Sequence, residues 1–336
     1  MAPVNIYILL LGSILLDFLI GDPAFLIHPV QIIGFWISWI SKTYQRFLQK
    51  KIFLFFGGFI IFLSSVILSY IAGKYVELRF FQSNAKTFWG IITILGISSC
   101  LATKSLISSV LEVANLVEQN FHDEESKQSA IRKVQRLVSR EVGSFSKENL
   151  LRYATESLTE NSVDGIFGPL FWIFIGAICI KHSIYYPGPL SLGFSYKAIS
   201  TLDSMIGYKY MPYKYLGLVS AKIEDYVTFL PCRLVVLTLP LVSEKISNYF
   251  FLIKKTFYEG RKYESPNAGM SEGIFAYIAD VRLGGENRYR DKKIFKPLLN
   301  PKGNKCNKNS IRKICRLIIK LQILWIVFFS IVFFII

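Results

Sequence analysis

Residues 52–73 read IFLFFGGFIIFLSSVILSYIAG, a run without a charged side chain. An α-helix needs about 20 predominantly apolar residues to cross the hydrocarbon core of a bilayer, so this stretch predicts a membrane-spanning helix. Comparable runs at 4–22, 87–107 and 317–336 predict three more. The first of them lacks the basic start and the small-residue cleavage site of a secretory signal, so we expect it to be retained as a membrane helix.

The composition of the whole chain agrees with a membrane protein. Of its 336 residues, 52% are hydrophobic and 18% are charged, and the mean hydropathy is +0.40. Soluble domains carry about 25% charged residues. Because strand patterns are weak throughout, the predicted fold is all-α: a polytopic integral membrane protein with about four to six membrane helices and cytoplasmic helical loops. We interpret residues 1–336 as a single integral-membrane domain.

Three polar blocks separate the apolar runs. Block 108–164 has the apolar stripe of a helix, and block 183–226 is rich in Tyr and Gly. Block 244–316 holds 17 Lys or Arg residues against 7 Asp or Glu residues, a net charge of +10 by subtraction. Such an excess predicts a cytoplasmic loop, followed by the C-terminal membrane helix at 317–336. No nucleic-acid-binding motif accompanies the basic charge, so nucleic acid is not an expected partner.

Two shorter apolar runs, 165–180 and 227–243, contain prolines. They are open to interpretation as tilted spans, re-entrant segments or buried helices. If neither crosses the membrane, all three polar blocks share the cytoplasmic side. We favour that arrangement because the polar motifs described next would have to meet in one site.

The first group of candidate residues follows the first predicted span. Asp17, Asp22 and His28 lie close together in the sequence, beside Pro23. A charged carboxylate at the centre of a bilayer costs about 2.5–3.5 kcal/mol on insertion scales, which favours a functional role. The alternative interpretation is a helix end at Gly21, with Asp17 reaching the membrane interface.

The second group is Glu156, Glu160, Asn161 and Asp164. The three acids are spaced four residues apart, so on a helix they share one face and repel each other unless a cation is bound. Carboxylate and amide oxygens suit Mg²⁺, a hard ion. The alternative is a solvated acidic face, but these acids adjoin an apolar run, which favours the metal site.

The third group contains Lys197 and Asp203, then Glu224, Asp225 and Arg233. An arginine inside an apolar run is costly unless it is paired. A carboxylate or a phosphate would be its natural partner. An ordinary interfacial ion pair is the alternative interpretation.

The fourth group begins with Ser265-Pro-Asn-Ala-Gly269, which reads as a tight turn. Asn267 would bond its own backbone, and Gly269 would supply a positive φ. The exposed N–H groups of such a turn bind phosphate oxygens. Arg282, beside Gly284-Gly285, would add a bidentate phosphate contact. The chain has no P-loop motif, and glycine-rich turns are common in structural roles.

Taken in order, these stretches resemble the CbiB/CobD family of cobalamin biosynthesis. Each segment is weak alone, but the ordered set is specific. The matching segments are LLLGSILLDFLIGDP, HPVQIIG, VSRE, ATESLTENSVDGIFGPLFW, KAISTLDSMIGYK, AKIEDYVTFLPCR, SPNAG and VRLGG.

The resemblance implies adenosylcobinamide-phosphate synthesis. The amine of (R)-1-aminopropan-2-ol, or of its phosphate, would form an amide with a propionate of the corrinoid adenosylcobyric acid, with ATP and Mg²⁺. It also implies a multi-pass protein of a prokaryotic cell membrane, in contact with the lipid bilayer and with other late enzymes of the pathway.

That reaction assigns roles to the candidate residues, and it has one rival. Glu156, Glu160, Asn161 and Asp164 would bind Mg²⁺ or nucleotide; Arg140, Lys197 and Arg282 would bind phosphate; and Asp203, Asp225 or His28 would act as the base. The rival is a multi-pass transporter or binding protein for an anionic metabolite, in which the buried acids and arginines would line a pathway.

Overall fold

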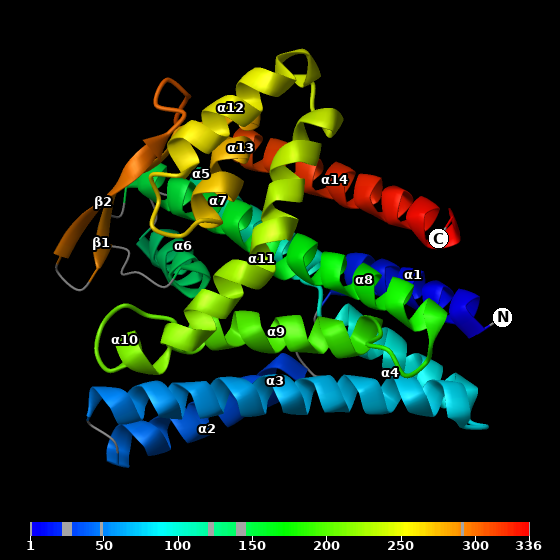
Figure 1. Cartoon of the computed structure of the whole chain (residues 1–336). Coiled ribbons are helices and arrows are strands. Elements are labelled where there is room, and N and C mark those ends of the chain that lie inside the picture. Colours follow the sequence, from blue (N-terminus) through cyan, green and yellow to red (C-terminus); the bar gives the residue numbers. More distant parts are fainter. Residues whose placement is uncertain are drawn as a thin grey trace. The chain divides into compact units, whose positions relative to one another are not determined.

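The computed structural model describes residues 2–21, 29–47, 50–119, 124–138, 146–289 and 292–335. The described chain is almost entirely helical (Figure 1). It divides into two compact units, which are described separately. The first comprises Met1–Lys104, Asp164–Thr228 and Phe329–Ile336, and the second comprises Ser105–Val163 and Phe229–Phe328.

The elements follow one another with short connections. They are α1 (Ala2–Leu19), α2 (Pro29–Phe47), α3 (Lys51–Gln82), α4 (Lys86–Ser98), α5 (Thr103–Gln119), α6 (Glu124–Leu137), α7 (Lys147–Ser162), a π-helical turn (Val163–Phe167), α8 (Gly168–His182), α9 (Pro189–Ile206), α10 (Tyr213–Leu216), α11 (Leu218–Thr238), two 3-10 turns (Leu239–Val242 and Ile246–Asn248), α12 (Tyr249–Gly260), α13 (Ala268–Ala279), β1 (Leu283–Tyr289), β2 (Lys292–Leu299) and α14 (Lys308–Ile335).

Within the described residues, five helical stretches are long and apolar enough to cross a membrane, which confirms the all-α polytopic class. The apolar part of α1, Asn5–Leu19, is shorter. The five stretches are Lys51–Gln82, Lys86–Glu118, Lys147–His182, Leu218–Val242 and Lys308–Ile335.

The predicted span at 87–107 lies within the candidate stretch Lys86–Glu118, in which the chain leaves helical geometry between Ser98 and Thr103. The shorter runs at 165–180 and 227–243 belong to longer stretches that have the length and composition of a span. Our expectation that neither run crosses the membrane stays a prediction.

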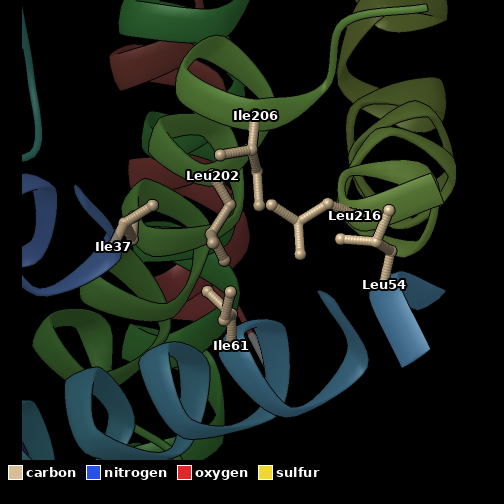
Figure 2. Packing of buried hydrophobic residues seen from close by; sticks show 6 residues of the cluster. All are labelled: Ile37, Leu54, Ile61, Leu202, Ile206 and Leu216. Carbon is tan, nitrogen blue, oxygen red and sulfur yellow. The ribbon is translucent and has the colours of Figure 1, made fainter. Parts of the chain in front are cut away.

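The core of the first unit lies between α3 and α9. A cluster of aliphatic side chains from α2, α3, α9 and α10 is almost completely buried there (Figure 2). Gly58 lets α3 approach α10, because a Cβ at this position would lie 1.8 Å from the carbonyl oxygen of Leu216. The buried members of the cluster are Ile37, Leu54, Ile61, Leu202, Ile206 and Leu216.

A buried carboxylate caps α9 from another helix. Glu77 of α3 is fully buried, and its Oε1 accepts the backbone N–H groups of Leu190 (2.7 Å) and Ser191 (2.9 Å) in the first turn of α9. The N-cap residue of α9 is Gly188, which has no side chain to do this. A Cβ on Gly188 would lie 2.4 Å from Glu77 Oε1, so the close approach requires glycine.

The second unit is built around α13. All twelve residues of α13 are buried, and the helix packs on α12, α7 and the two strands. A helix that is apolar on all sides is expected to be buried on all sides. Helix α6 covers α7, and Lys133 of α6 pairs with Glu112 of α5 at 2.7 Å.

Strands β1 and β2 form an antiparallel hairpin that the sequence analysis did not identify. Gly284 and Gly285 have φ values of 82° and 96°, a conformation that favours glycine. A Cβ on Gly284 would also lie 2.1 Å from the carbonyl oxygen of Pro297 in β2. The glycine pair and the proline break the apolar alternation that usually indicates strands.

Replacing Glu77 by Ala should lower the free energy of unfolding by about 3 kcal/mol, because two buried N–H groups of α9 lose their acceptor and each unsatisfied group costs about 1–3 kcal/mol. Glu77→Gln keeps an acceptor oxygen and should cost less. Thermal unfolding in detergent micelles measures both. Glu244→Ala, at an exposed position, is the control, and equal melting temperatures for the two alanine variants would contradict the capping role.

Candidate active site

Glu156 joins α7 to the hairpin. It is fully buried, and its Oε1 accepts hydrogen bonds from Arg152 Nη1 (2.8 Å) and from the backbone N–H of Gly284 (3.0 Å). The Arg152 guanidinium also donates to the carbonyl oxygens of Gly284 and Glu286, each at 2.7 Å. This carboxylate, predicted as a metal ligand, therefore holds β1 against α7.

Glu160 lies one turn further along α7 and is half-buried. Its carboxylate makes no hydrogen bond or ion pair with another described residue. The neighbouring Asn161 donates from Nδ2 to Ser157 Oγ at 2.8 Å, and Asp164, which begins the next part of the first unit, is half-buried. The half-buried carboxylate of Glu160 thus keeps the capacity to bind a ligand.

The positions of the described carboxylates bear on the predicted Mg²⁺ site. Among the described residues, no group of three or more His, Cys, Asp or Glu side chains is arranged to hold a metal ion. Mg²⁺ needs only one or two protein carboxylates when phosphate oxygens and water complete its shell. Binding of Mg²⁺ by Glu156, Glu160, Asn161 and Asp164 therefore stays a prediction, and of these side chains Glu156 is the one that bonds Arg152 and Gly284.

A second buried carboxylate, Glu272 of α13, was missed by the sequence analysis. Its Oε1 accepts from Lys296 Nζ and its Oε2 from the Tyr263 hydroxyl, both at 3.2 Å. Burial, and then the negative charges of Glu272 and Glu156, raises the pKa of Tyr263, so the phenol keeps its proton and acts as a donor. The sequence feature that could have identified Glu272 is a lone acid in the apolar stretch AGMSEGIFAYIA.

The predicted phosphate-binding turn uses its backbone donors internally. Ser265 Oγ accepts the N–H groups of Asn267 (3.2 Å) and Ala268 (3.3 Å). The carboxamide oxygen Oδ1 of Asn267 accepts from Arg233 Nη1 at 2.5 Å, and the predicted bond of this side chain to its own backbone stays a prediction. Arg233 Nη2 donates to the carbonyl oxygen of Pro266 at 2.8 Å. Arg233 of α11 thus donates to an amide oxygen and to a carbonyl oxygen of the turn before α13.

Gly269 has a different role from the predicted one. It lies in the first turn of α13 and does not have a positive φ. A Cβ there would lie 2.3 Å from the carbonyl oxygen of Gly260 and 2.8 Å from Tyr263 Cβ. Glycine is required because α12 and α13 approach closely, so Gly269→Val would disturb packing and would not probe phosphate binding.

Arg282 remains available to a ligand. Its backbone N–H donates to the carbonyl oxygen of Asn304 at 2.8 Å, which fixes the chain just before β1. The side chain is exposed, and its guanidinium forms no hydrogen bond or ion pair within the part of the chain that the structure describes. It is therefore well suited to an anionic substrate.

In the first unit, Asp17 and the backbone of Gly165 both bond the chain where α4 ends and α5 begins. Asp17 is fully buried, and its Oδ2 accepts the backbone N–H of Thr103, the first residue of α5, at 3.1 Å. The preceding Ala102 N–H donates to the carbonyl oxygen of Gly165, at 3.0 Å. Gly165 lies in a π-helical turn, a feature frequent at functional sites.

Helix α9 carries Lys197 and Asp203, both half-buried. Gly193 lies one turn before Lys197 and packs against Cys100. A Cβ on Gly193 would lie 3.1 Å from the Sγ atom of Cys100. Asp203 lies near the end of α9. Burial, with smaller contributions from neighbouring tyrosines and Asp203, raises the pKa of Tyr208.

Glu224 and Asp225 occupy different environments on α11. Glu224 is buried, and its Oε1 accepts from the Thr228 hydroxyl at 2.6 Å. Thr228 also shares a hydrogen bond of 3.0 Å with the Tyr196 hydroxyl of α9. Asp225 is half-buried, so of the two it is the more accessible candidate base.

Three predicted site residues, Asp22, His28 and Arg140, lie outside the described residues. Their assignments stay predictions.

The helices suited to a membrane and the polar groups buried among them define an all-α polytopic membrane protein with internal acid, base and amide networks. The family model of the CobD/CbiB protein matches residues 10–318, and the chain belongs to this family.

Curated relatives extend the match over most of the chain. A cobalamin biosynthesis protein CobD of Synechocystis is 36% identical over 88% of this chain and 83% of its own length. A CobD protein of Clostridium acetobutylicum is 32% identical over 95% of this chain and 96% of its own. A cobalamin biosynthesis protein CbiB of Salmonella typhi is 31% identical over 84% and 83%. No solved structure matches the chain.

Replacing Arg152 by Met should lower the free energy of unfolding by about 3 kcal/mol, because it leaves the Glu156 charge buried and unpaired. The double variant Arg152→Met/Glu156→Gln should recover part of the loss, since no unpaired charge remains. Unfolding of all four members of this cycle measures the coupling. Lys305→Met, which breaks an exposed pair with Glu148, should change stability little. Strictly additive losses would show that the pair is not coupled.

Proposed function

We propose that this chain is an enzyme of cobalamin biosynthesis that forms an amide between adenosylcobyric acid and (R)-1-aminopropan-2-ol or its phosphate, with ATP hydrolysis. The observation that carries the proposal is the family match over residues 10–318, together with relatives named as cobalamin biosynthesis proteins that align over 83% and 96% of their own length. The proposed location is the cell membrane of a prokaryote, where other late enzymes of the pathway are the proposed partners.

The chemistry sets the demands on the site. A carboxylate is a poor acylating agent, so ATP must first convert the corrinoid propionate to an acyl phosphate or an adenylate. The amine must then lose a proton to attack. Hydrogen-bond donors and cations aimed at the developing phosphoryl charge would supply much of the rate.

The described residues offer groups for each demand. Glu160, Asn161 and Asp164 would hold Mg²⁺, which neutralises phosphate charge. The Glu160 carboxylate supports this, because it makes no hydrogen bond or ion pair within the described part of the chain. The exposed guanidinium of Arg282 and the ammonium of Lys197 would bind phosphate. Asp203 and the accessible Asp225 are the proposed bases in the described chain.

The activity is testable on protein purified in detergent, which has no sealed compartment. Cobyric acid incubated with the protein, ATP, Mg²⁺ and aminopropanol phosphate should give a product whose mass equals the sum of the two organic substrates minus one water. Omitting ATP is the control. Absence of product, together with uptake of an anionic corrinoid into sealed proteoliposomes, would favour the transporter instead.

Glu160→Gln removes one charge with little change in shape. We expect kcat/KM to fall at least about tenfold, equivalent to about 1.4 kcal/mol, and the Mg²⁺ concentration for half-maximal activity to rise. Glu148→Gln on the same helix is the matched control, because Glu148 is exposed and pairs only at the surface. Normal turnover with an unchanged Mg²⁺ requirement would return Glu160 to the solvated-face interpretation.

A further inference from the structure

Helix α12 exposes large aromatic side chains although it is not among the candidate spans. Phe250 is 84% exposed, Phe251 55% and Tyr258 53%. The opposite side of the helix, with Leu252, Thr256, Glu259 and Gly260, is buried, and α12 lies beside α13 (Figure 1). An exposed apolar face of this kind marks an interaction surface.

Basic side chains alternate with the aromatic ones. Lys254 and Lys255 are exposed on the helix, and Arg261 and Lys262 are exposed just after it. Lys255 Nζ lies 5.9 Å from the centroid of the Phe251 ring, and Lys262 Nζ lies 4.7 Å from that of Tyr258. The only acid within the helix, Glu259, is buried. The exposed face is therefore both apolar and cationic.

The exposed face of α12 lies close in sequence to a candidate membrane span. Six residues, 243–248, separate the candidate span Leu218–Val242 from Tyr249, the first residue of α12. Six extended residues reach at most about 20–25 Å. The Tyr249 hydroxyl also donates to the carbonyl oxygen of Leu237, inside that span, at 3.0 Å. Twelve helical residues are about 18 Å long, too short to cross a core of about 30 Å.

We propose that α12 lies in the plane of the membrane interface and binds anionic phospholipid. Its aromatic side chains enter the boundary between headgroups and acyl chains, where aromatic residues are enriched, and its lysines contact lipid phosphates. Positive charges beside a membrane are attracted by anionic lipid. A protein partner would use apolar contacts too, but the cationic face and the adjoining span favour lipid.

A spin label at Phe250→Cys in the full-length protein tests the location. The Cys179→Ser background removes the native cysteine that is not buried. In nanodiscs of phosphatidylglycerol and phosphatidylcholine, the label should collide more with oxygen than with a water-soluble nickel complex, at a depth of about 5–10 Å. A label at Lys302→Cys, in an exposed turn of the same unit, should show the opposite preference. A Phe250 label that behaves like the Lys302 label, or is shielded from both reagents, overturns the proposal.

The same label tests the lipid charge. The double variant Lys254→Gln/Lys255→Gln should make the Phe250 label shallower in anionic nanodiscs and leave it unchanged in pure phosphatidylcholine. Lys302→Gln/Lys305→Gln is the matched control and should have no effect in either. An equal change in both lipids, or none in the anionic ones, would rule out recognition of anionic phospholipid. Neither measurement depends on catalysis, so both are independent of the proposed enzyme activity.

Discussion

Backbone N–H groups at the start of a helix or strand need acceptors where water is excluded, and in this chain buried carboxylates supply them. Glu77 receives the first N–H groups of α9, Asp17 receives that of α5, and Glu156 receives that of Gly284 in β1. Hydrogen bonds to an ionised acceptor are roughly twice as strong as neutral ones. The packing of α9 on α3, and with it the core of the first unit, depends on Glu77 fixing where α9 begins.

The acids discussed above fall into two groups by burial. Glu77, Asp17, Glu156 and also Glu272 are fully buried and hold elements together. Glu160 and Asp225 are half-buried and keep surfaces that a substrate can reach. Glu160 and Asp225, which we propose for metal binding and for the base, thus differ in burial from the acids that connect elements of the fold.

Most membrane spans and many of the acids could be predicted from the sequence, because apolar length and lone charges are visible in one dimension. Glu77 and Glu272 could not, since a single acid near the end of a span or inside an apolar helix has no evident role until its partner from elsewhere in the chain is known. Asp17 was identified, but its partner Thr103 was not.

The glycine-containing motifs were harder to interpret. Gly269 was predicted to need a positive φ, yet its role is close packing against Gly260, whereas Gly284 and Gly285 do have the positive φ that glycine permits. The presence of a glycine indicates only that a side chain is disfavoured at that position. Whether the reason is backbone geometry or a neighbouring helix depends on contacts between distant segments. The pairing of β1 with β2 likewise depends on contacts that the sequence pattern does not show.

The interruption between α4 and α5 has an electrostatic consequence. Each end of a helix carries about half an elementary charge, negative where α4 ends and positive where α5 begins. In a continuous helix these partial charges would cancel, but here both terminate within a segment suited to the bilayer. The buried Asp17 carboxylate accepts the first N–H group of α5, and its negative charge stabilises the positive end of that helix. The break thus leaves two helix ends inside a segment suited to the bilayer, and a buried acid stabilises one of them.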